Sequence, residues 1–177
     1  LLPFRQKIQV TFQDPYSSLN PRMKIGEILS EPMKVHGIIT DARKRDERVL
    51  ELLQLCGLSP RFADRYPHEM SGGQRQRVGV ARALAMDPEF IVCDECVSAM
   101  DVSVQAQVLN LLRELQEKRN LTYLFISHNC NIIQQFCHDV FVLHQGDVVE
   151  SGTIESVFSN PQHPATQMLL EASPNLY

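Results

Sequence analysis

Short apolar runs alternate with segments of helical periodicity along the chain, and this alternation restricts the possible folds more than any other feature of the sequence. Apolar runs of four or five residues bounded by turn residues are typical of buried strands. We predict strands over residues 8–12, 90–93, 123–126, 140–143 and 148–149, the last two joined as a hairpin through Gln145, Gly146 and Asp147. Strands that alternate with helices favour an α/β fold around a mainly parallel sheet.

The long segment between the first two predicted strands has the pattern of helix and loop only. Thr40 is predicted to cap a helix that ends at Gly57, because a hydroxyl can accept from the first-turn N–H groups and glycine tolerates the left-handed exit. A second helix is predicted to open at Ser71 and to stop near Asp87 and Pro88. The sequence therefore predicts a helical subdomain inserted into a sheet lobe.

Three more helices are expected after this insert. One begins at about Ser103, and two short ones follow the hairpin over residues 154–158 and 165–172. The helix from Ser103 has one apolar stripe, made of Val104, Val108, Leu111, Leu112 and Leu115. A stripe with this spacing is typical of core packing, not of a cofactor site.

Composition excludes several classes of protein. The chain has 177 residues, of which 44% are hydrophobic and 21% charged, as in ordinary globular domains. No apolar run approaches the roughly 18 residues of a membrane-spanning helix. The net charge of −4 argues against nucleic acid as the main partner, and none is predicted.

The five cysteines are odd in number and lie mostly in apolar segments, which favours reduced thiols in a reducing compartment. Cys93 and Cys96 have the spacing of redox or zinc motifs. Because a structural zinc site uses about four ligands and the chain has one such pair, no metal is predicted there.

The first motif with chemical meaning is Met70-Ser71-Gly72-Gly73-Gln74-Arg75-Gln76-Arg77. Two glycines after a capping serine let backbone N–H groups converge at a helix N-terminus, where the helix dipole favours an anion such as phosphate. A simple cap and loop explain the Ser-Gly-Gly run equally well on physical grounds.

The second motif is an apolar strand that ends in two adjacent carboxylates, Phe90-Ile91-Val92-Cys93-Asp94-Glu95. Ligands bind at the carboxyl edge of a parallel sheet, where one acid can support Mg²⁺ and the other can orient an attacking water. The third is the strand that leads to Ser127 and His128. A single histidine in that position is more often a surface or cap residue than a catalyst.

Taken in order along the chain, these motifs resemble the ATP-binding cassette (ABC) family. The resemblance identifies Ser71-Gly72-Gly73-Gln74 as the signature, the strand ending in Asp94 and Glu95 as Walker B, and His128 as the switch histidine. It also identifies Gln13 as the Q-loop glutamine and Ser98-Ala99-Met100-Asp101 as the D-loop. It covers nearly the whole chain and implies the sheet core of P-loop NTPases, incomplete here, with the helical signature subdomain inserted.

The resemblance implies a role for each of these residues. Asp94 supports Mg²⁺, with Gln13 touching the metal or water, and Glu95 acts as general base or water-positioner while His128 contacts the γ-phosphate. The residues that contact ATP held by an opposing subunit, or that lie at the dimer interface, are Ser71, Gly72, Gly73, Gln74 and Asp101. Catalytic residues are thus predicted to be Glu95, His128 and Gln13, with ATP and Mg²⁺ as cofactors.

The resemblance also implies an organisation and a set of partners. Residues 1–177 correspond to part of a nucleotide-binding domain: the Q-loop and helical subdomain at about 14–88, the Walker B to H-loop core at 89–152, and C-terminal helices at 153–177. Partners are a second ABC ATPase subunit in a homo- or heterodimer, integral membrane permease subunits and, indirectly, an extracytoplasmic solute-binding protein. The location is peripheral, on the cytoplasmic face of the bacterial inner membrane.

Two segments resemble the bacterial dipeptide, oligopeptide and nickel importers. They are the run from Phe12 to Met23 and the tail Asn160-Pro161-Gln162-His163-Pro164. The chain departs from the family at Cys96, where proline is usual, and at Met100, Asn129 and Ala165, where leucine, aspartate and tyrosine are usual. Losing the proline removes a φ constraint next to Glu95.

No G-x-x-x-x-G-K-[ST] motif, the family's main phosphate cradle, occurs in the 177 residues, and the chain does not begin with Met. We therefore expect an N-terminally truncated ABC importer ATPase that is inactive alone. Reading the coding sequence upstream of Leu1 is the simplest test of the truncation. Two alternatives stay open. The first is a non-catalytic remnant or interaction fragment, which the retained Glu95 and His128 disfavour. The second is a non-transport ABC ATPase, for which long coiled-coil or basic insertions are expected, and the sequence has neither.

Overall fold

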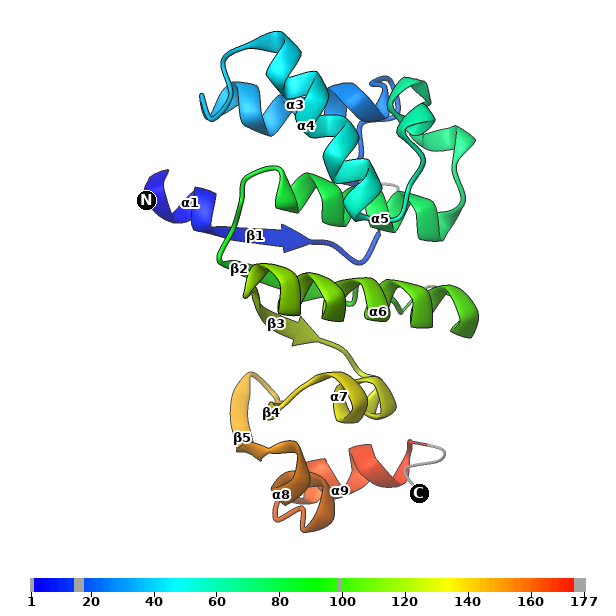
Figure 1. Cartoon of the computed structure of the whole chain (residues 1–177). Coiled ribbons are helices and arrows are strands. Elements are labelled where there is room, and N and C mark those ends of the chain that lie inside the picture. Colours follow the sequence, from blue (N-terminus) through cyan, green and yellow to red (C-terminus); the bar gives the residue numbers. More distant parts are fainter. Residues whose placement is uncertain (1, 15–17, 99, 174–177) are drawn as a thin grey trace. The chain divides into compact units, whose positions relative to one another are not determined.

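The computed structural model describes residues 2–14, 18–98 and 100–173 (Figure 1). The chain divides into two compact units, Leu1–Ile126 and Ser127–Tyr177. The division lies inside the segment 89–152 that we predicted as one core. The boundaries at residues 88 and 152 stay predictions.

A three-stranded parallel sheet lies at the centre of the first unit, with strands in the order β1 (Ile8–Thr11), β2 (Phe90–Asp94) and β3 (Thr122–Ile126). Thr11 is opposite Cys93, and Asp94 is opposite Ile126. A short helix, α1 (Leu2–Lys7), precedes β1. The sheet confirms the predicted α/β fold, and its register aligns the carboxyl ends of β1, β2 and β3.

Among the described residues between β1 and β2, every regular element is a helix and loops join them, as predicted (Figure 1). They are α3 (Ile25–Val35), α4 (Ala42–Leu55), the short 3-10 helices η1 (Pro60–Asp64) and η2 (Pro67–Glu69), and α5 (Gly72–Leu84). Their shared interior is fully buried and contains Ile25, Leu29, Met33, Leu52, Leu53 and Val78. Periodic apolar positions therefore build a core of their own for this insert.

Two helix starts differ from the prediction by one residue. Asp41, not Thr40, caps α4, because its carboxylate accepts a 2.9 Å hydrogen bond from the N–H of Lys44. Helix α6 (Val102–Arg119) begins one residue before Ser103, since Asp101 caps it. At each helix start, more than one nearby residue has a side chain able to cap the helix. Residue preference alone does not decide which of them becomes the N-cap.

Helix α6 packs on the sheet through its predicted stripe. Val108, Leu112 and Leu115 are buried, and the hydroxyl of Tyr123 in β3 donates a 3.0 Å hydrogen bond to the carbonyl of Leu112. The helix ends at Asn120, whose φ of 51° is left-handed. Asparagine is one of the few residues that adopt this exit readily.

The second unit contains α7 (Cys130–Phe136), the antiparallel strands β4 (Asp139–His144) and β5 (Asp147–Thr153), α8 (Ile154–Ser159) and α9 (Pro164–Glu171). The predicted hairpin is confirmed: Gln145 and Gly146 both have positive φ, 52° and 94°, as a two-residue hairpin turn requires. Glu150 accepts hydrogen bonds from the N–H groups of Gln162 and His163, which attaches the tail segment to β5. In the described part of the chain, no helix is both long enough and apolar enough to cross a membrane.

Candidate functional site

The carboxyl edge of the sheet brings three predicted site residues together. Asp94 is the last residue of β2, Glu95 follows it, and Gln13 lies two residues beyond β1. The Nε2 atom of Gln13 donates a 2.7 Å hydrogen bond to Oε2 of Glu95. Because β1 and β2 are parallel neighbours, residues far apart in the sequence meet where both strands end.

The main chain of Glu95 is held in an unusual conformation. Its φ is +44°, a left-handed value that costs a residue with a Cβ roughly 1–2 kcal/mol. Its N–H donates a 3.0 Å hydrogen bond to the carbonyl of Ile126 in β3, and its carbonyl accepts from both the N–H and the hydroxyl of Ser98. Such a conformation persists where neighbouring contacts fix it, and it is frequent at functional sites.

Beneath the two carboxylates the side chains are buried. Thr11, Cys93 and Cys96 are 3%, 0% and 1% exposed. The neighbouring Cys93 thiol and burial together raise the pKa of the Cys96 thiol. The strand end therefore presents acids to solvent and a pair of free thiols to the interior.

The signature residues form the first turn of α5. Ser71 is the N-cap: its hydroxyl accepts from the N–H of Gln74, and the side-chain carbonyl of Gln74 accepts a 3.0 Å hydrogen bond from the N–H of Ser71. This reciprocal capping box makes the turn rigid. Ser71 and Gly72 are exposed, whereas Gly73 is buried.

The two glycines of the signature differ in their surroundings. A Cβ on Gly73 would lie 2.2 Å from Cγ1 of Val104, in the first turn of α6. A Cβ on Gly72 would meet no atom within 4 Å. Asp101 fixes that turn of α6, because its carboxylate accepts a 3.0 Å hydrogen bond from the N–H of Val104. The signature and the D-loop are thus joined through Val104, a link that sequence reasoning missed.

Sequence reasoning placed Arg82 on the signature helix, facing an anionic nucleotide, but missed its contact within the chain. Its guanidinium, on α5, donates a hydrogen bond to the carbonyl of Ser18, in the segment that follows Gln13. Burial lowers the pKa of Arg82, while the charge of Glu31 opposes that shift. The only sequence signal is its place on the signature helix, since no motif predicts which carbonyl the side chain of an arginine reaches.

His128 belongs to the second unit and is exposed. The next residue, Asn129, caps α7 by accepting from the N–H groups of Asn131 and Ile132. Asparagine can cap the helix in place of the aspartate usual in the family, since both side chains are good N-caps. The place of His128 relative to Glu95 stays a prediction.

The donors at the sheet edge fit a magnesium ion. Asp94 and Glu95 are partly exposed carboxylates beside the Gln13 amide, and oxygen donors are the ligands that Mg²⁺ prefers. Among the described residues, no cluster of three or more His, Cys, Asp or Glu side chains could hold a metal alone. Mg²⁺ commonly takes one or two carboxylates, with phosphates and water completing its shell.

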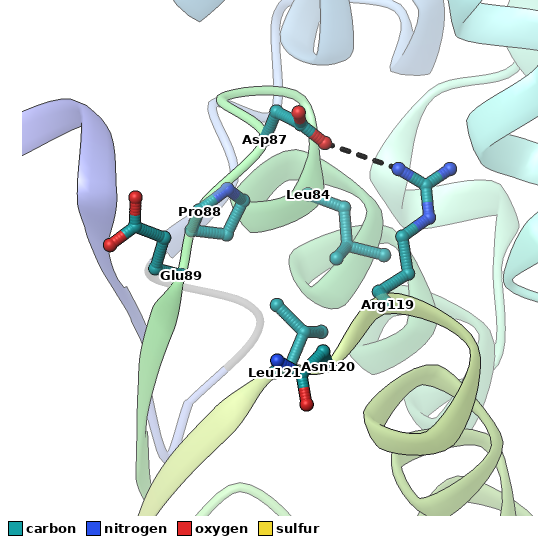
Figure 2. Close-up of a pocket in the computed structure, with 7 residues that line it drawn as sticks. All are labelled: Leu84, Asp87, Pro88, Glu89, Arg119, Asn120 and Leu121. Carbon is teal, nitrogen blue, oxygen red and sulfur yellow. Dashed lines mark hydrogen bonds and ion pairs between the residues drawn. The ribbon is translucent and has the colours of Figure 1, made fainter.

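A cavity of about 300 Å³ lies at the opposite edge of the sheet (Figure 2). It is bordered by the residues that enter β2 and β3, with an ion pair of 3.1 Å between Asp87 and Arg119. None of the predicted site residues lines it. The candidate site is therefore the carboxyl edge, where the polar groups converge.

This fold and this arrangement of groups define a cassette-type nucleotide-binding domain. The sequence model of the family described as "ABC transporter" matches residues 2–98, and the chain belongs to that family. Both the family and the fold class predicted from the motifs are confirmed.

Individual relatives agree. The chain is 52% identical over 172 residues to the dipeptide transport ATP-binding protein DppF of Haemophilus influenzae and 50% identical over 174 residues to the oligopeptide transport ATP-binding protein OppF of Bacillus subtilis. These alignments cover 97% and 98% of this chain but 52% and 57% of the relatives. The chain therefore spans about half the length of the curated relatives it matches.

Two solved structures are similar as well. One is an ATP-binding cassette whose dimeric, post-hydrolysis structure is bound to ADP and Pi. The two chains have a TM-score of 0.71 and 29% sequence identity, and the match covers 85% of this chain and 64% of the other. The other is cbiO1 from Clostridium perfringens, part of the ABC transporter complex cbiONQ. Here the TM-score is 0.77 and the sequence identity 27%, and the match covers 88% of this chain and 61% of the other.

Proposed function

We propose that this chain forms part of the ATP-binding and ATP-hydrolysing subunit of an ABC importer for peptides or a related solute. The observation that carries the proposal is the meeting of Gln13 and Glu95 beside Asp94 at the carboxyl edge of the sheet. The relatives named as dipeptide and oligopeptide transport ATP-binding proteins support the solute class.

In the proposed reaction Glu95 accepts a hydrogen bond from the attacking water and holds it in line with the γ-phosphate. Gln13 keeps the Glu95 carboxylate in place through its amide, and its carbonyl oxygen is available to metal or water. Asp94 would hold Mg²⁺, and the bound ion would neutralise negative charge on the phosphates. His128 would donate to the γ-phosphate. Positioning and charge stabilisation are what phosphoryl transfer mainly requires.

The signature residues act on a nucleotide held by a second subunit in a head-to-tail dimer. Ser71, Gly72, Gly73 and Gln74 present the N-terminus of α5, where N–H groups and the helix dipole favour an anion. The open space around Gly72 supports close approach by a ligand, since no atom of the described residues lies within 4 Å of a Cβ built there. Asp101 lies at the dimer interface in this proposal.

The partners follow from the same reading. Membrane permease subunits receive the motion of the helical insert, a solute-binding protein acts indirectly, and no nucleic acid takes part. The subunit is peripheral, on the cytoplasmic face of the bacterial inner membrane. The divisions at residues 14–88, 89–152 and 153–177 belong to this proposal.

The decisive experiment compares hydrolysis with ATP-dependent dimerisation in the product of the complete open reading frame. Glu95→Gln should slow hydrolysis about 100-fold or more while ATP still drives dimerisation. The matched control is Glu89→Gln, at the other end of β2, where Glu89 pairs with Lys7 and should be irrelevant to hydrolysis. Equal hydrolysis by the Glu95→Gln variant and the unmodified protein would refute the role of Glu95.

Two further measurements separate the alternatives. A polypeptide of these 177 residues, which contain no G-x-x-x-x-G-K-[ST] motif, should show no ATP hydrolysis by itself; turnover sensitive to Glu95→Gln would contradict this. Cells that produce only the Glu95→Gln protein should lose uptake of a labelled dipeptide. Unimpaired uptake in such cells would favour a remnant or a non-transport ATPase.

A further inference from the structure

Arg82 contacts the main chain of the segment that follows Gln13. It lies near the end of α5 and is partly buried, and its guanidinium donates a hydrogen bond to the carbonyl of Ser18. The side chain of the next residue, Leu19, is 1% exposed. Hydrogen bonds from a charged donor are among the stronger ones in proteins, and the planar guanidinium fixes their direction. The main chain at Ser18 is therefore held by a charged hydrogen bond and by the burial of Leu19.

A main-chain hydrogen bond connects Ser18 with the residue next to Gln13. The N–H of Ser18 donates a 3.3 Å hydrogen bond to the carbonyl of Asp14, which directly follows Gln13. On the other side of Gln13, strand β1 packs against α5, the helix that carries Arg82. The side chain of Gln13 is exposed, so its own burial does not hold it in place. Its position depends on the chain before and after it, and α5 contacts both.

We propose that Arg82 is a positioning residue for Gln13: by holding the carbonyl of Ser18, it keeps the Gln13 amide against the carboxylate of Glu95. In the proposed function, on which this inference rests, Glu95 orients the attacking water. The hydrogen bond between Gln13 and Glu95 is 2.7 Å long, and a displacement of about 1 Å is enough to lose it. Misplacement of this size commonly lowers the rate of an enzymatic reaction. Arg82 touches neither substrate nor reacting atoms in this role.

The contact with Ser18 distinguishes this role from a direct contact with the nucleotide. The guanidinium of Arg82 donates to a main-chain carbonyl, and it lies at the opposite end of α5 from Ser71 and Gly72. The two roles predict different kinetics. Loss of a nucleotide contact weakens ATP binding and raises KM, whereas a misplaced Gln13 lowers kcat.

Steady-state ATP hydrolysis by the complete open-reading-frame product tests the role. Arg82→Gln should lower kcat by about 3–10-fold and leave KM for ATP within about 2-fold of the unmodified value. The matched control is Arg45→Gln, because the Arg45 guanidinium also donates to main-chain carbonyls of the helical insert, those of Ile39 and Thr40. This control should leave kcat unchanged. A raised KM with unchanged kcat in Arg82→Gln, or an equal loss of kcat in Arg45→Gln, would overturn the proposal.

A double variant separates positioning from a general loss of structure. If Arg82 acts through Gln13, its substitution has nothing left to misplace once the Gln13 amide is gone. Arg82→Gln combined with Gln13→Ala should therefore have the kcat of Gln13→Ala alone. Fully additive losses of kcat would show that Arg82 acts by another route and would overturn the proposal.

Hydrogen–deuterium exchange of the same protein without nucleotide tests the contact independently of hydrolysis. In Arg82→Gln, the peptide that contains Ser18 and Leu19 should exchange roughly 10-fold faster, while peptides from α3 and α4 exchange as before. Unchanged exchange at Ser18 would overturn the proposal, and so would faster exchange throughout the insert, since Arg82 would then support the whole insert. No hydrolysis by the unmodified protein would overturn the proposed function, while the exchange measurement still decides whether Arg82 holds Ser18.

Discussion

The amide of Gln13 donates a 2.7 Å hydrogen bond to the carboxylate of Glu95 across a sequence separation of 82 residues. The two residues meet because each follows a strand, and those strands are parallel neighbours whose ends are aligned by the pairing of Thr11 with Cys93. The contact joins the segment that leads into the helical insert to the proposed water-positioning group.

Removing the Gln13 amide should therefore impair hydrolysis. In the complete open-reading-frame product, Gln13→Ala should lower the rate by about 10–100-fold, because Glu95 loses the group that orients it. Gln9→Ala is the matched control, since the amide of Gln9, on the strand β1 that leads to Gln13, donates instead to the carbonyl of Arg5. The rate of Gln13→Ala combined with Glu95→Gln should be close to that of Glu95→Gln alone. Fully additive losses would show that the two residues act independently.

Gly73 should be required for folding stability. Gly73→Ala places a methyl 2.2 Å from Cγ1 of Val104, so α5 and α6 must separate, at a cost of about 1–3 kcal/mol. Adding Val104→Ala should recover part of this loss. In the same helix, Gly79→Ala meets no atom within 4 Å and should stabilise the chain by about 0.5–1 kcal/mol. Urea unfolding of the three variants measures each effect; equal stabilities for Gly73→Ala and Gly79→Ala would contradict the packing argument.

Asp101 should stabilise the start of α6. Its carboxylate accepts from the N–H of Val104, and loss of such a cap in Asp101→Ala should lower the free energy of unfolding by about 1 kcal/mol. Asp101→Asn keeps an acceptor at the same position and should lose much less. Circular dichroism during urea titration distinguishes the two; similar losses would mean that the charge, not the hydrogen bond, is what matters.

Alkaline pH should destabilise the first unit through Cys56. Burial raises the pKa of this thiol from 9.0 to about 12, outweighing the opposing charges of Arg77 and Arg119. The unfolded chain releases the proton near pH 9 while the folded chain retains it, so the stabilising contribution is complete below pH 9. It is lost as the pH rises to about 12, by about 1.4 kcal/mol per pH unit.

Cys56→Ala tests this dependence. Unfolding free energies measured from pH 8 upward should fall less steeply for this variant than for the unmodified chain. The difference between the two curves isolates Cys56 from Cys96 and Tyr123, whose pKa values are also raised by their surroundings. Parallel curves would contradict the burial argument.

Local patterns predicted the strands and most of the helices, but α1, α3 and α7 were not predicted individually. The apolar runs became β1 to β5, and the stripe on α6 packs inward through Val108, Leu112 and Leu115. Motif order identified the family, which the comparisons confirm. Cap choice was less certain, as Asp41 shows, because adjacent polar residues compete for the same N–H groups.

The sequence by itself determined most of the elements, the family and the residues to consider, because periodicity, caps and turn residues act over a few positions. Only the tertiary structure decided that Gln13 contacts Glu95, that Gly73 lies against Val104 and that Arg82 reaches Ser18. Those contacts depend on strand register and on the close approach of two helices, which no short stretch of sequence specifies.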